Sequence, residues 1–256
     1  MNQQIHNPEK LMFSIITVSY NCKNTFSMTM DSVVKQSFQN IEYIVVDGQS
    51  TDGTAELIKE RQSRIDKWVS EPDSGIYDAM NKGVSMASGE WILFLNSGDL
   101  LADEQVLEKV ADSINNRANL DIVYGNILVE KGGELVVREA KDPQSIHKMY
   151  FCHQSAFTKT NLLRKIPFDT NYKMSADLDF FKRCYDEGYT FLKLPLLITI
   201  YDLTGISNTN RVAGLQENIQ IIKKRDRGQK RIILLFRLYF VVYRIKLTRL
   251  FKPSNQ

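Results

Sequence analysis

The sequence is poor in cysteine and has no Cys-x-x-Cys pair. Its three cysteines, Cys22, Cys152 and Cys184, are odd in number, which argues against a disulfide framework and against a zinc site. Cysteines without a pairing pattern are typically buried thiols of proteins in a reducing compartment. The first ten residues lack the apolar core of a secretory signal peptide, so the cytoplasm is the expected location.

Glycine-rich phosphate loops are also absent. After the first predicted strand the chain reads SYNCK at 19–23, with neither a GxGxxG motif nor the glycine loop of a sugar-nucleotide pyrophosphorylase. This argues against both a dinucleotide-dependent dehydrogenase and a pyrophosphorylase. Between residues 230 and 252 no uninterrupted apolar run approaches the roughly 20 residues that a membrane-spanning helix requires.

Charge is distributed unevenly along the chain. The net charge is +3, but residues 223–252 contain eleven basic side chains and a single acidic one, Asp226, and carry +10. The remainder therefore carries −7. An acidic body with a basic end argues against nucleic-acid binding through the main domain and directs the basic end toward an anionic surface.

Apolar runs alternate with amphipathic segments over the first hundred residues, which predicts parallel crossovers and a doubly wound α/β sheet. The predicted strands are 13–20, 41–46 and 91–95, and the predicted helices are 27–36, 54–68 and 76–87. Beyond residue 100 the pattern predicts a helix at 103–116 capped by Asp103, a hairpin of strands 121–129 and 134–139, and a helix at 178–187 ended by Gly188.

Polar side chains follow two of these buried strands directly. Asp47 comes after the second strand, and the loop Asn96-Ser97-Gly98-Asp99 comes after the third. Open α/β sheets bind ligands at the carboxyl ends of their strands. A carboxylate in that position suits a divalent cation that holds a diphosphate.

The ordered set of segments resembles family 2 glycosyltransferases, which are inverting, nucleotide-sugar-dependent enzymes with a GT-A fold. The resemblance covers roughly residues 12–207 and is carried by SIITVSYN at 14–21, VVDGQSTDGT at 45–54, the segment 71–99, HQ at 153–154 and SADLD at 175–179. It implies a Rossmann-like, mostly parallel sheet flanked by helices. The implied domain is 1–210, with a nucleotide-sugar half at about 12–100 and an acceptor half at about 101–210, followed by a helical appendage at 211–256.

The resemblance places the nucleotide-sugar donor along the first strands and the segment that follows them. Asp47 matches the aspartate that contacts the nucleoside base in the family, although an aspartate that merely closes a turn is the structural alternative. Asp73 and Asp78 flank a helix start, where an acid also complements the helix dipole. The residues implied for donor binding are Thr17, Ser19, Tyr20, Asp47, Asp73, Asp78, Asn81, Lys82, Asn96 and Asp99.

The family's acidic DxD motif is reduced in this chain. Asn96 and Gly98 stand where acids often occur, which leaves Asp99 as the carboxylate of the loop. The resemblance implies that Asp99 holds Mn²⁺ or Mg²⁺ against the diphosphate, with an asparagine carbonyl and nucleotide oxygens as further ligands.

Two aspartates, Asp177 and Asp179, precede an apolar helix, where they also suit an N-cap and a first helical turn. The family places its catalytic base at this point, so Asp177 is the implied base and Asp179 the second candidate. His153 and Gln154 are implied as acceptor or diphosphate contacts, against the alternative of a structural histidine.

The C-terminal segment 230–252 carries an apolar stripe at helical spacing, with basic residues on separate faces. The members of the stripe are Ile232, Phe236, Tyr239, Phe240, Tyr243, Leu247, Leu250 and Phe251. This predicts a helix lying in the interface of an anionic membrane, with packing on the catalytic domain or on a second subunit as the alternative. By analogy with the family, the acceptor is a glycan or a polyprenyl-diphosphate-linked oligosaccharide at the inner face of the cell membrane, in surface-polysaccharide assembly.

Two other functions remain open on the sequence alone. A glycosidase also needs two carboxylates but no nucleotide site. A non-catalytic nucleotide-sugar-binding subunit is compatible with the reduced acidic motif. The donor sugar, its base, the linkage and the oligomeric state are not specified by the sequence.

Overall fold

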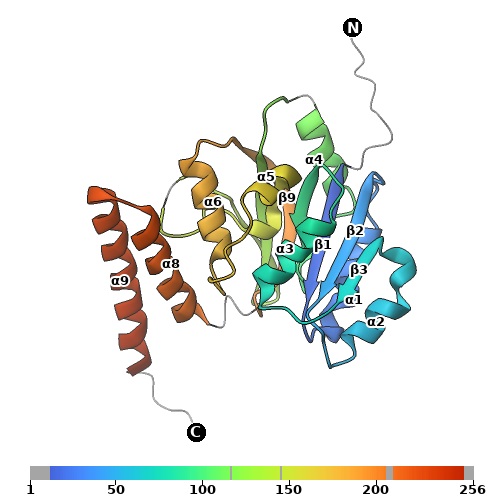
Figure 1. Ribbon diagram of the computed structural model, residues 1–256, viewed down its shortest axis with the longest axis horizontal. Helices are drawn as coiled ribbons and strands as arrows, with labels where there is room; N and C mark the ends of the chain where they lie inside the picture. The colour runs from blue at the N-terminus through green and yellow to red at the C-terminus, as the bar shows by residue number, and fades with distance from the viewer. Residues whose placement is uncertain (1–11, 116, 145, 206–209, 251–256) are drawn as a thin grey trace.

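The computed structural model describes residues 12–115, 117–144, 146–205 and 210–250. The described residues form a nine-stranded mixed sheet in the order β3-β2-β1-β4-β8-β6-β9-β5, with β7 paired to β6 (Figure 1). The strands are β1 (Phe13–Ser19), β2 (Ile41–Asp47), β3 (Lys67–Ser70), β4 (Trp91–Phe94), β5 (Leu100–Leu101), β6 (Ile122–Lys131), β7 (Glu134–Arg138), β8 (Ala156–Lys159) and β9 (Phe191–Tyr201). Strands β1 to β4 are mutually parallel, β8 is antiparallel to both of its neighbours, and β9 runs parallel to β6.

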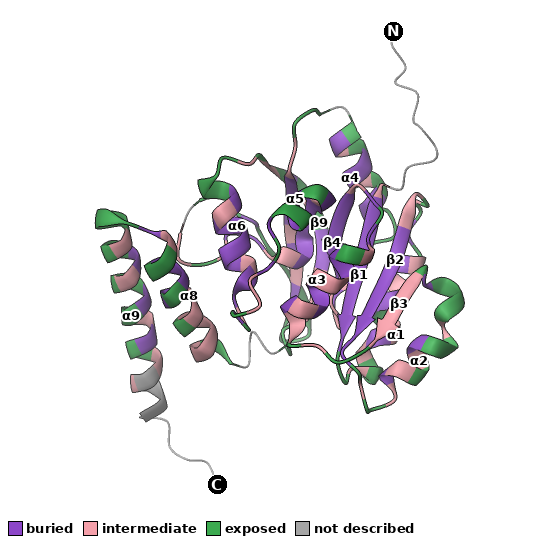
Figure 2. Ribbon diagram, viewed as in Figure 1, coloured by how far each residue is buried: buried purple, intermediate pink, exposed green. Residues whose placement is uncertain are grey.

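Helices cover both faces of the sheet. The helices are α1 (Lys23–Val34), α2 (Thr54–Glu60), α3 (Ile76–Met86), α4 (Val106–Asn115), α5 (Thr160–Lys165), α6 (Ala176–Asp186), α8 (Arg211–Arg225) and α9 (Gly228–Leu250), with 3₁₀ turns η1 (Gln62–Arg64) and η2 (His153–Ser155). Helices α3, α5 and α6 enclose one hydrophobic core against the sheet, and α1, α2 and α4 enclose the other. All seven residues of β1 are consequently buried, as expected for a central parallel strand (Figure 2).

The helix predicted at 54–68 is wrong in its second half. Helix α2 ends at Glu60, and Trp68 lies in β3, which pairs in parallel with β2. The Asp66 carboxylate accepts the backbone N–H of Tyr43 at 2.7 Å and secures the entry to this strand. Pairing with the sheet edge therefore overrides the helical pattern. The other predicted elements of the first hundred residues are present with end shifts of a few residues.

The second half differs from the sequence prediction in two further details. Helix α4 begins at Val106, and Asp103 instead accepts the N–H of Gln105 in the turn before it. The predicted hairpin is present as β6 and β7. Strand β9 covers eleven residues for which no strand was predicted, and its Pro195 lies where the pairing with β6 shifts register. A bulged position is where a strand tolerates a residue without an N–H donor.

The C-terminal helices form a hairpin that the sequence prediction treated as one appendage. Ile221 of α8 belongs to the main core, so α8 is attached to the body that the sheet forms. Leu234, Leu238 and Val242 of α9 pack on Ile219 and Ile222 of α8. The opposite face of α9 is exposed and carries most of the predicted stripe, namely Ile232, Phe236, Tyr239, Phe240 and Tyr243 at 48–73% exposure.

No helix within the described ranges is both long and apolar enough to cross a membrane. Phe251 and the side chains of Lys246, Arg249 and Leu250 lie outside the part of the chain whose side chains the structure describes.

Candidate active site

The carboxyl ends of β1 and β2 meet at one edge of the sheet, at the lower end in Figure 1. Asp47, the last residue of β2, is fully buried. Its carboxylate accepts hydrogen bonds from the hydroxyls of Ser19 (3.1 Å), Ser50 (2.5 Å) and Ser70 (2.7 Å), and from the Ser50 N–H (2.9 Å). In this structure Asp47 therefore shapes the loop that follows β2, as the turn alternative describes, and draws Ser19 into the same network.

Two further residues that were predicted to bind the nucleotide-sugar donor lie close to Gly48, the residue directly after Asp47. A β-carbon at position 48 would lie 2.5 Å from Asp73 Oδ2 and 3.3 Å from Tyr20 Cδ2. Tyr20 is 67% exposed. An exposed aromatic ring beside a carboxylate is a suitable platform for a nucleoside base, because the ring stacks while the carboxylate accepts N–H or O–H groups.

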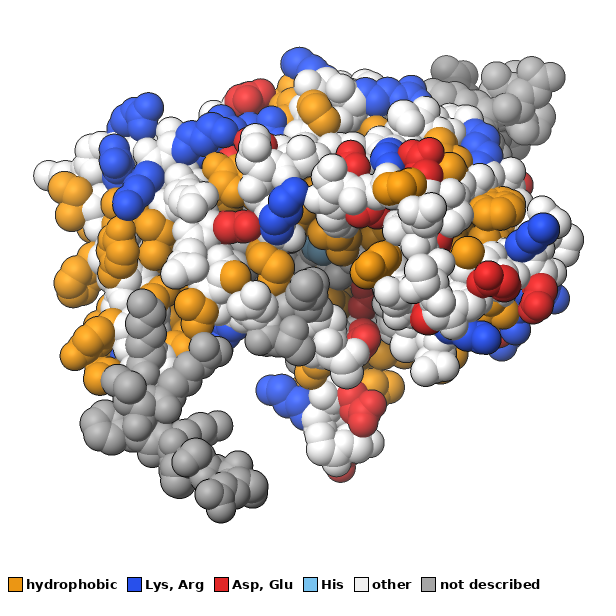
Figure 3. Space-filling model, turned by 60° about the horizontal axis from the view of Figure 1, so that its bottom comes forward, with side chains coloured by type: hydrophobic (Ala, Val, Ile, Leu, Met, Phe, Trp, Pro, Cys, Tyr) orange, Lys and Arg blue, Asp and Glu red, His pale blue; other side chains and the backbone are white. Residues whose placement is uncertain are grey.

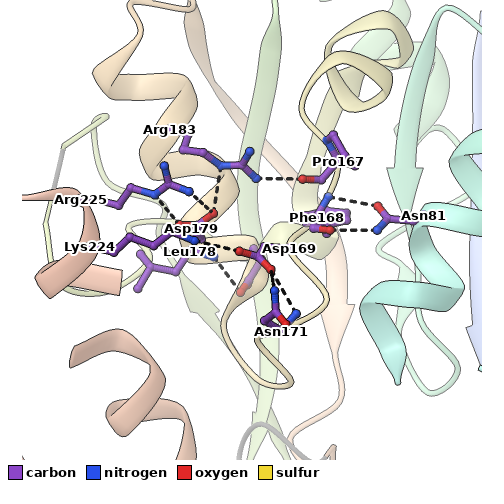
Figure 4. A network of polar contacts seen from close by, with 11 residues as sticks. Asn81, Pro167, Phe168, Asp169, Asn171, Leu178, Asp179, Arg183, Lys224 and Arg225 are labelled. Atoms are coloured by element: carbon purple, nitrogen blue, oxygen red, sulfur yellow. Dashed lines mark hydrogen bonds and ion pairs between the residues drawn. The ribbon is translucent and has the colours of Figure 1, made fainter. Parts of the chain in front are cut away.

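Two residues predicted to bind the donor instead make internal contacts. The Thr17 hydroxyl donates to the carbonyl of Leu95 at 2.8 Å and accepts from Tyr43, so it ties β1 to its neighbours. The Asn81 side chain exchanges two hydrogen bonds with the backbone of Phe168, at 3.0 and 3.1 Å (Figure 4). The structure does not bring either side chain to the edge of the sheet at which β1 and β2 end, which we call the ligand edge.

Asp78 and Lys82 stabilise the loop that leads into α3. Asp78 accepts the N–H of Ser74 at 2.9 Å. Lys82 forms an ion pair with Glu71 at 2.8 Å and donates to the carbonyl of Pro72 at 2.7 Å. Both side chains thus hold the loop that carries Asp73 in place.

Asp99 lies in the segment between β4 and β5 and is 3% exposed. Its Oδ1 accepts the backbone N–H of Asp202 at 2.9 Å. Burial raises the pKa of Asp99 to about 7, although the Asp202 N–H and a hydrogen bond from Gln154 act in the opposite direction. Gln154 is itself buried and therefore belongs to the same cluster.

Asp202 is a residue of this cluster that the sequence prediction missed. It follows β9, and its carboxylate lies beside the loop, since a β-carbon at Gly98 would approach Asp202 Oδ2 to 2.6 Å. Pairing of β5 with β9 brings these segments together across about a hundred residues of sequence. In the sequence, the only signal for Asp202 was an acidic residue directly after a strand-like segment.

The loop at 96–99 offers oxygen atoms of the kind that Mg²⁺ and Mn²⁺ prefer. Asn96 Oδ1 and Ser97 Oγ are buried and have no hydrogen-bond partner among the described residues. Asp99 and Asp202 lie beside the same loop, so their carboxylates and these side-chain oxygens would be the ligands that the protein offers to a divalent cation. Within the described ranges no group of three or more His, Cys, Asp or Glu side chains is placed to hold a metal by itself, so a diphosphate would have to complete the ligands.

His153, Asp177 and Tyr77 form the second half of the cluster. His153 Nδ1 lies 3.2 Å from Asp177 Oδ2, and the Tyr77 hydroxyl donates to Asp177 Oδ1 at 2.9 Å. The two side chains of the His153–Asp177 pair are 14% and 15% exposed. Asp177 is the second residue of α6, because Ser175 occupies the N-cap position.

The hydrogen bonds to Asp177 determine its charge. Burial opposes ionisation, but the hydrogen bond and charge of His153 and the Tyr77 hydroxyl outweigh it and hold the pKa of Asp177 below its usual value. Conversely, burial and the Asp177 charge raise the pKa of Tyr77 well above its usual value. Asp177 is therefore an ionised carboxylate that accepts from both neighbours.

Asp179, the second predicted base, does not reach this cluster. It is fully buried and forms ion pairs with Arg225 of α8 (2.8 Å) and Arg183 of α6 (2.9 Å). Figure 4 shows these contacts, with Lys224 of α8 bound to Asp169 beside them. The geometry gives Asp179 the role of joining α6 to α8.

Known proteins match this chain both in sequence and in fold. The family profile described as Glycosyl transferase family 2 matches residues 14–179. A "PGL/p-HBAD biosynthesis glycosyltransferase" of Mycobacterium bovis is 31% identical over 217 residues, which cover 81% of this chain and 80% of the relative.

Solved structures share the fold. S. aureus TarS 1–349 in complex with UDP-GlcNAc has a TM-score of 0.67 at 19% identity, covering 89% of this chain and 71% of that one. The mannosyltransferase PcManGT from Pyrobaculum calidifontis, in complex with GDP-Man and Mn²⁺, has a TM-score of 0.67 at 18% identity, covering 92% and 70%. The chain spans 41% of the longer S. aureus TarS chain, with a TM-score of 0.63 at 22% identity.

Proposed function

Because the chain belongs to glycosyl transferase family 2 and is a nucleotide-sugar-dependent glycosyltransferase, we propose that it moves a sugar from a UDP-sugar, with inversion, to a hydroxyl of a glycan or polyprenyl-diphosphate-linked acceptor. The observation that carries the proposal is the cluster at the sheet edge, in which His153 contacts Asp177 and lies near enough to Asp99 for its charge to act on that carboxyl group. The UDP and UDP-GlcNAc complexes of S. aureus TarS support the choice of donor class.

In the proposed reaction the nucleoside lies along Tyr20 and Asp73, over the loop that Asp47 shapes. The diphosphate then reaches Asn96, Asp99 and Asp202. A divalent cation bound to these oxygens would neutralise the negative charge that develops on the departing diphosphate. The acceptor hydroxyl loses its proton to the His153–Asp177 pair and attacks the anomeric carbon from the face opposite the leaving group.

The proposed location is the cytoplasmic face of a membrane that carries the lipid-linked acceptor. The exposed apolar face of α9 supports it, since Figure 3 shows hydrophobic side chains gathered on that side of the molecule with Lys and Arg side chains beside them. A relative that acts in PGL/p-HBAD biosynthesis supports a glycolipid or glycan acceptor.

The test is nucleotide binding followed by turnover. A thermal-shift panel of UDP, GDP, CDP and dTDP, each with and without Mn²⁺, should give the largest shift for UDP with metal, because a ligand at 100 times its Kd adds ~2.7 kcal/mol. Donor hydrolysis or transfer by the wild type then separates an enzyme from a non-catalytic binding subunit. Nucleotide binding without any turnover would favour the binding subunit, and no nucleotide binding would favour a glycosidase.

The Asp177→Asn variant provides the matching site test. Its transfer should fall by ~10²–10⁴-fold while UDP affinity stays at the wild-type value, since Asp177 lies on the acceptor side. Wild-type turnover in this variant would contradict the assignment of the pair.

A further inference from the structure

Strand β7 (Glu134–Arg138) is the second strand of a hairpin that extends into solvent. All five of its residues are exposed, with Leu135 at 54%, Val136 at 41% and Val137 at 49%. The turn before it also lies in open space, since a β-carbon at Gly132 or Gly133 would meet no atom within 4 Å. Among the described residues β7 pairs only with β6, so its other edge carries unpaired N–H and C=O groups.

The turn determines which residues of β7 face this free edge. Its two glycines have positive φ, 62° and 87°, as in a two-residue hairpin turn. The residues that flank such a turn, Lys131 and Glu134, form a hydrogen-bonded pair, and such pairs alternate with non-hydrogen-bonded ones along the ladder. The backbone groups of every second residue from Glu134 therefore point toward β6. Those of Leu135 and Val137 point toward the free edge.

The sequence of β7 is complementary to itself when it is read in the opposite direction. It is Glu-Leu-Val-Val-Arg, with an acid at one end, a base at the other and apolar residues between them. Neither Glu134 nor Arg138 forms an ion pair with another residue that the structure describes. The strand therefore offers backbone groups, apolar side chains and two opposite charges to a partner strand.

We propose that β7 pairs antiparallel with β7 of a second copy of this chain, across a two-fold axis at Val136. In this register Leu135 lies opposite Val137 of the second copy, and each such pair exchanges two backbone hydrogen bonds. Glu134 lies opposite Arg138 of the second copy, so the contact contains an ion pair at each end. Cross-strand pairs of opposite charge and of β-branched side chains are favourable ones.

Two independent requirements select this register. Leu135 and Val137 must lie opposite residues whose backbone groups also face outward, which excludes every shift by a single residue. A shift that moves the two-fold axis to Leu135 or to Val137 leaves one hydrogen-bonded pair instead of two and removes both ion pairs. A parallel arrangement would set like charges beside one another at each end of the strand.

The proposed contact closes at two copies, because it occupies the free edge of β7 in both of them. Two five-residue strands bury less surface than a permanent dimer needs. Association should therefore be weak, with a Kd on the order of micromolar or above. The contact uses no residue of α9, so a variant of β7 keeps the surface by which the protein is proposed to bind a membrane.

The first test is charge reversal, and it does not depend on the proposed function. Arg138→Glu and Glu134→Arg each set like charges opposite one another, so each variant should dimerise at least about tenfold more weakly than wild type. Mixed in equal amounts, the two variants again have opposite charges at both ends and should form a heterodimer with the wild-type Kd. Sedimentation velocity between ~1 and ~300 µM protein measures this association.

Two further variants separate the strand contact from a general effect of charge. Glu130→Arg reverses an exposed charge on β6 in the same hairpin but outside the contact, and it should dimerise as wild type. Leu135→Pro removes an N–H that points to the free edge and leaves the N–H groups that face β6, so it should weaken the dimer. The melting temperature of each variant shows whether it is folded.

The outcomes that would overturn the proposal are equally specific. A wild type that stays monomeric over the whole range would do so, and so would a dimer that tolerates both charge reversals and Leu135→Pro. A dimer that is lost only when Ile232, Phe236 and Phe240 of α9 are replaced by serine would place the interface on α9 instead.

Discussion

Asp99 is 3% exposed, and this burial raises the pKa of its carboxyl group to about 7. Because the folded state binds this proton more tightly than the unfolded state does, the free energy of unfolding falls as the pH rises from about 4 to 7. Above pH 7 the destabilisation is complete. The residue that we propose binds the diphosphate of the donor is therefore also one that destabilises the ligand-free protein at neutral pH.

The Asp99→Asn substitution should separate these two effects. In nucleotide-free and metal-free buffer at pH 8 the variant should melt on the order of 5 °C above wild type, since the buried charge is removed, while at pH 4.5 the difference should vanish. Transfer should be lost at both pH values. Differential scanning fluorimetry at the two pH values is the measurement, and an equal difference in Tm at both would contradict the burial argument.

At the scale of elements, buried ion pairs join α6 to α8. Asp179 binds Arg225 and Arg183, and the buried pair Lys182–Asp226 lies at 3.0 Å beside them. Glu217 of α8 also accepts the N–H groups of residues 173–175, which precede α6. Helix α8 thus fixes the start of α6, where Asp177 lies.

The Asp179→Asn substitution tests this structural role. Two guanidinium groups would lose their partner, so the free energy of unfolding should fall by about 3–5 kcal/mol, while kcat measured well below Tm should stay near the wild-type value. Urea unfolding and initial rates are the measurements. Loss of transfer with an unchanged unfolding midpoint would instead make Asp179 catalytic.

A second buried carboxylate, Glu42 of β2, joins three strands to the turn before β4. It accepts from Ser14 Oγ (2.5 Å), Lys67 Nζ (2.7 Å) and the N–H groups of Ser88 and Gly89. Burial opposes its ionisation, but Lys67 and these donors outweigh it and lower the pKa of Glu42. Since the folded-state pKa is the lower one, its stabilisation is present above the usual glutamate range and is lost as the pH falls.

The Glu42→Gln variant should therefore lose about 2–4 kcal/mol at pH 7, with a difference from wild type that shrinks below pH 4. The exposed Glu60→Gln on α2 is the matched control and should be neutral. A loss in Glu42→Gln that is the same at pH 7 and pH 3.5 would rule out the titration argument.

The parts of the site that lie in consecutive motifs were predictable from the sequence. Asp99 and Asp177 follow recognisable segments, and the structure places them in one cluster. Asp202 and Tyr77 were not predicted, because they reach Asp99 and Asp177 across 103 and 100 residues through strand pairing and helix packing. No local pattern records such a contact.

The direction in which side chains point was the second feature that could not be predicted from the sequence. Thr17 and Asn81 occupy positions that suit ligand binding, yet their polar atoms are used by Leu95 and by the Phe168 backbone. In α9 the chain carries two apolar stripes, and only tertiary contact with α8 determines that Leu234 and Leu238 are the packed ones.

At the scale of the whole molecule, α9 presents a continuous apolar surface. Ile232, Phe236 and Phe240 are 68%, 73% and 54% exposed, and Arg237 and Arg244 are exposed on the same helix. Apolar side chains flanked by arginines suit the interface of an anionic bilayer, where the rings enter the headgroup region and the guanidinium groups bind phosphate.

Serine substitution of Ile232, Phe236 and Phe240 should abolish co-sedimentation with vesicles that contain anionic lipid, and leave transfer to a soluble acceptor unchanged. The double substitution Leu135→Ser and Val137→Ser, on exposed apolar residues of β7, is the matched control and should sediment as wild type. Unchanged sedimentation of the α9 variant would contradict membrane binding. A monomer–dimer shift in its place would identify a second copy as the partner of this face.

The ion pairs between α8 and α6 give the helical hairpin a further consequence. If α9 lies on the bilayer as proposed, the packing of α9 on α8 and the ion pairs of α8 with α6 hold the candidate site around Asp177 at a set height above the lipid surface. An acceptor anchored by a lipid diphosphate would then react only when its terminal sugar extends to that height. The hairpin would then limit glycan length, because the distance from the membrane to the cluster would select the number of sugars already attached to the acceptor.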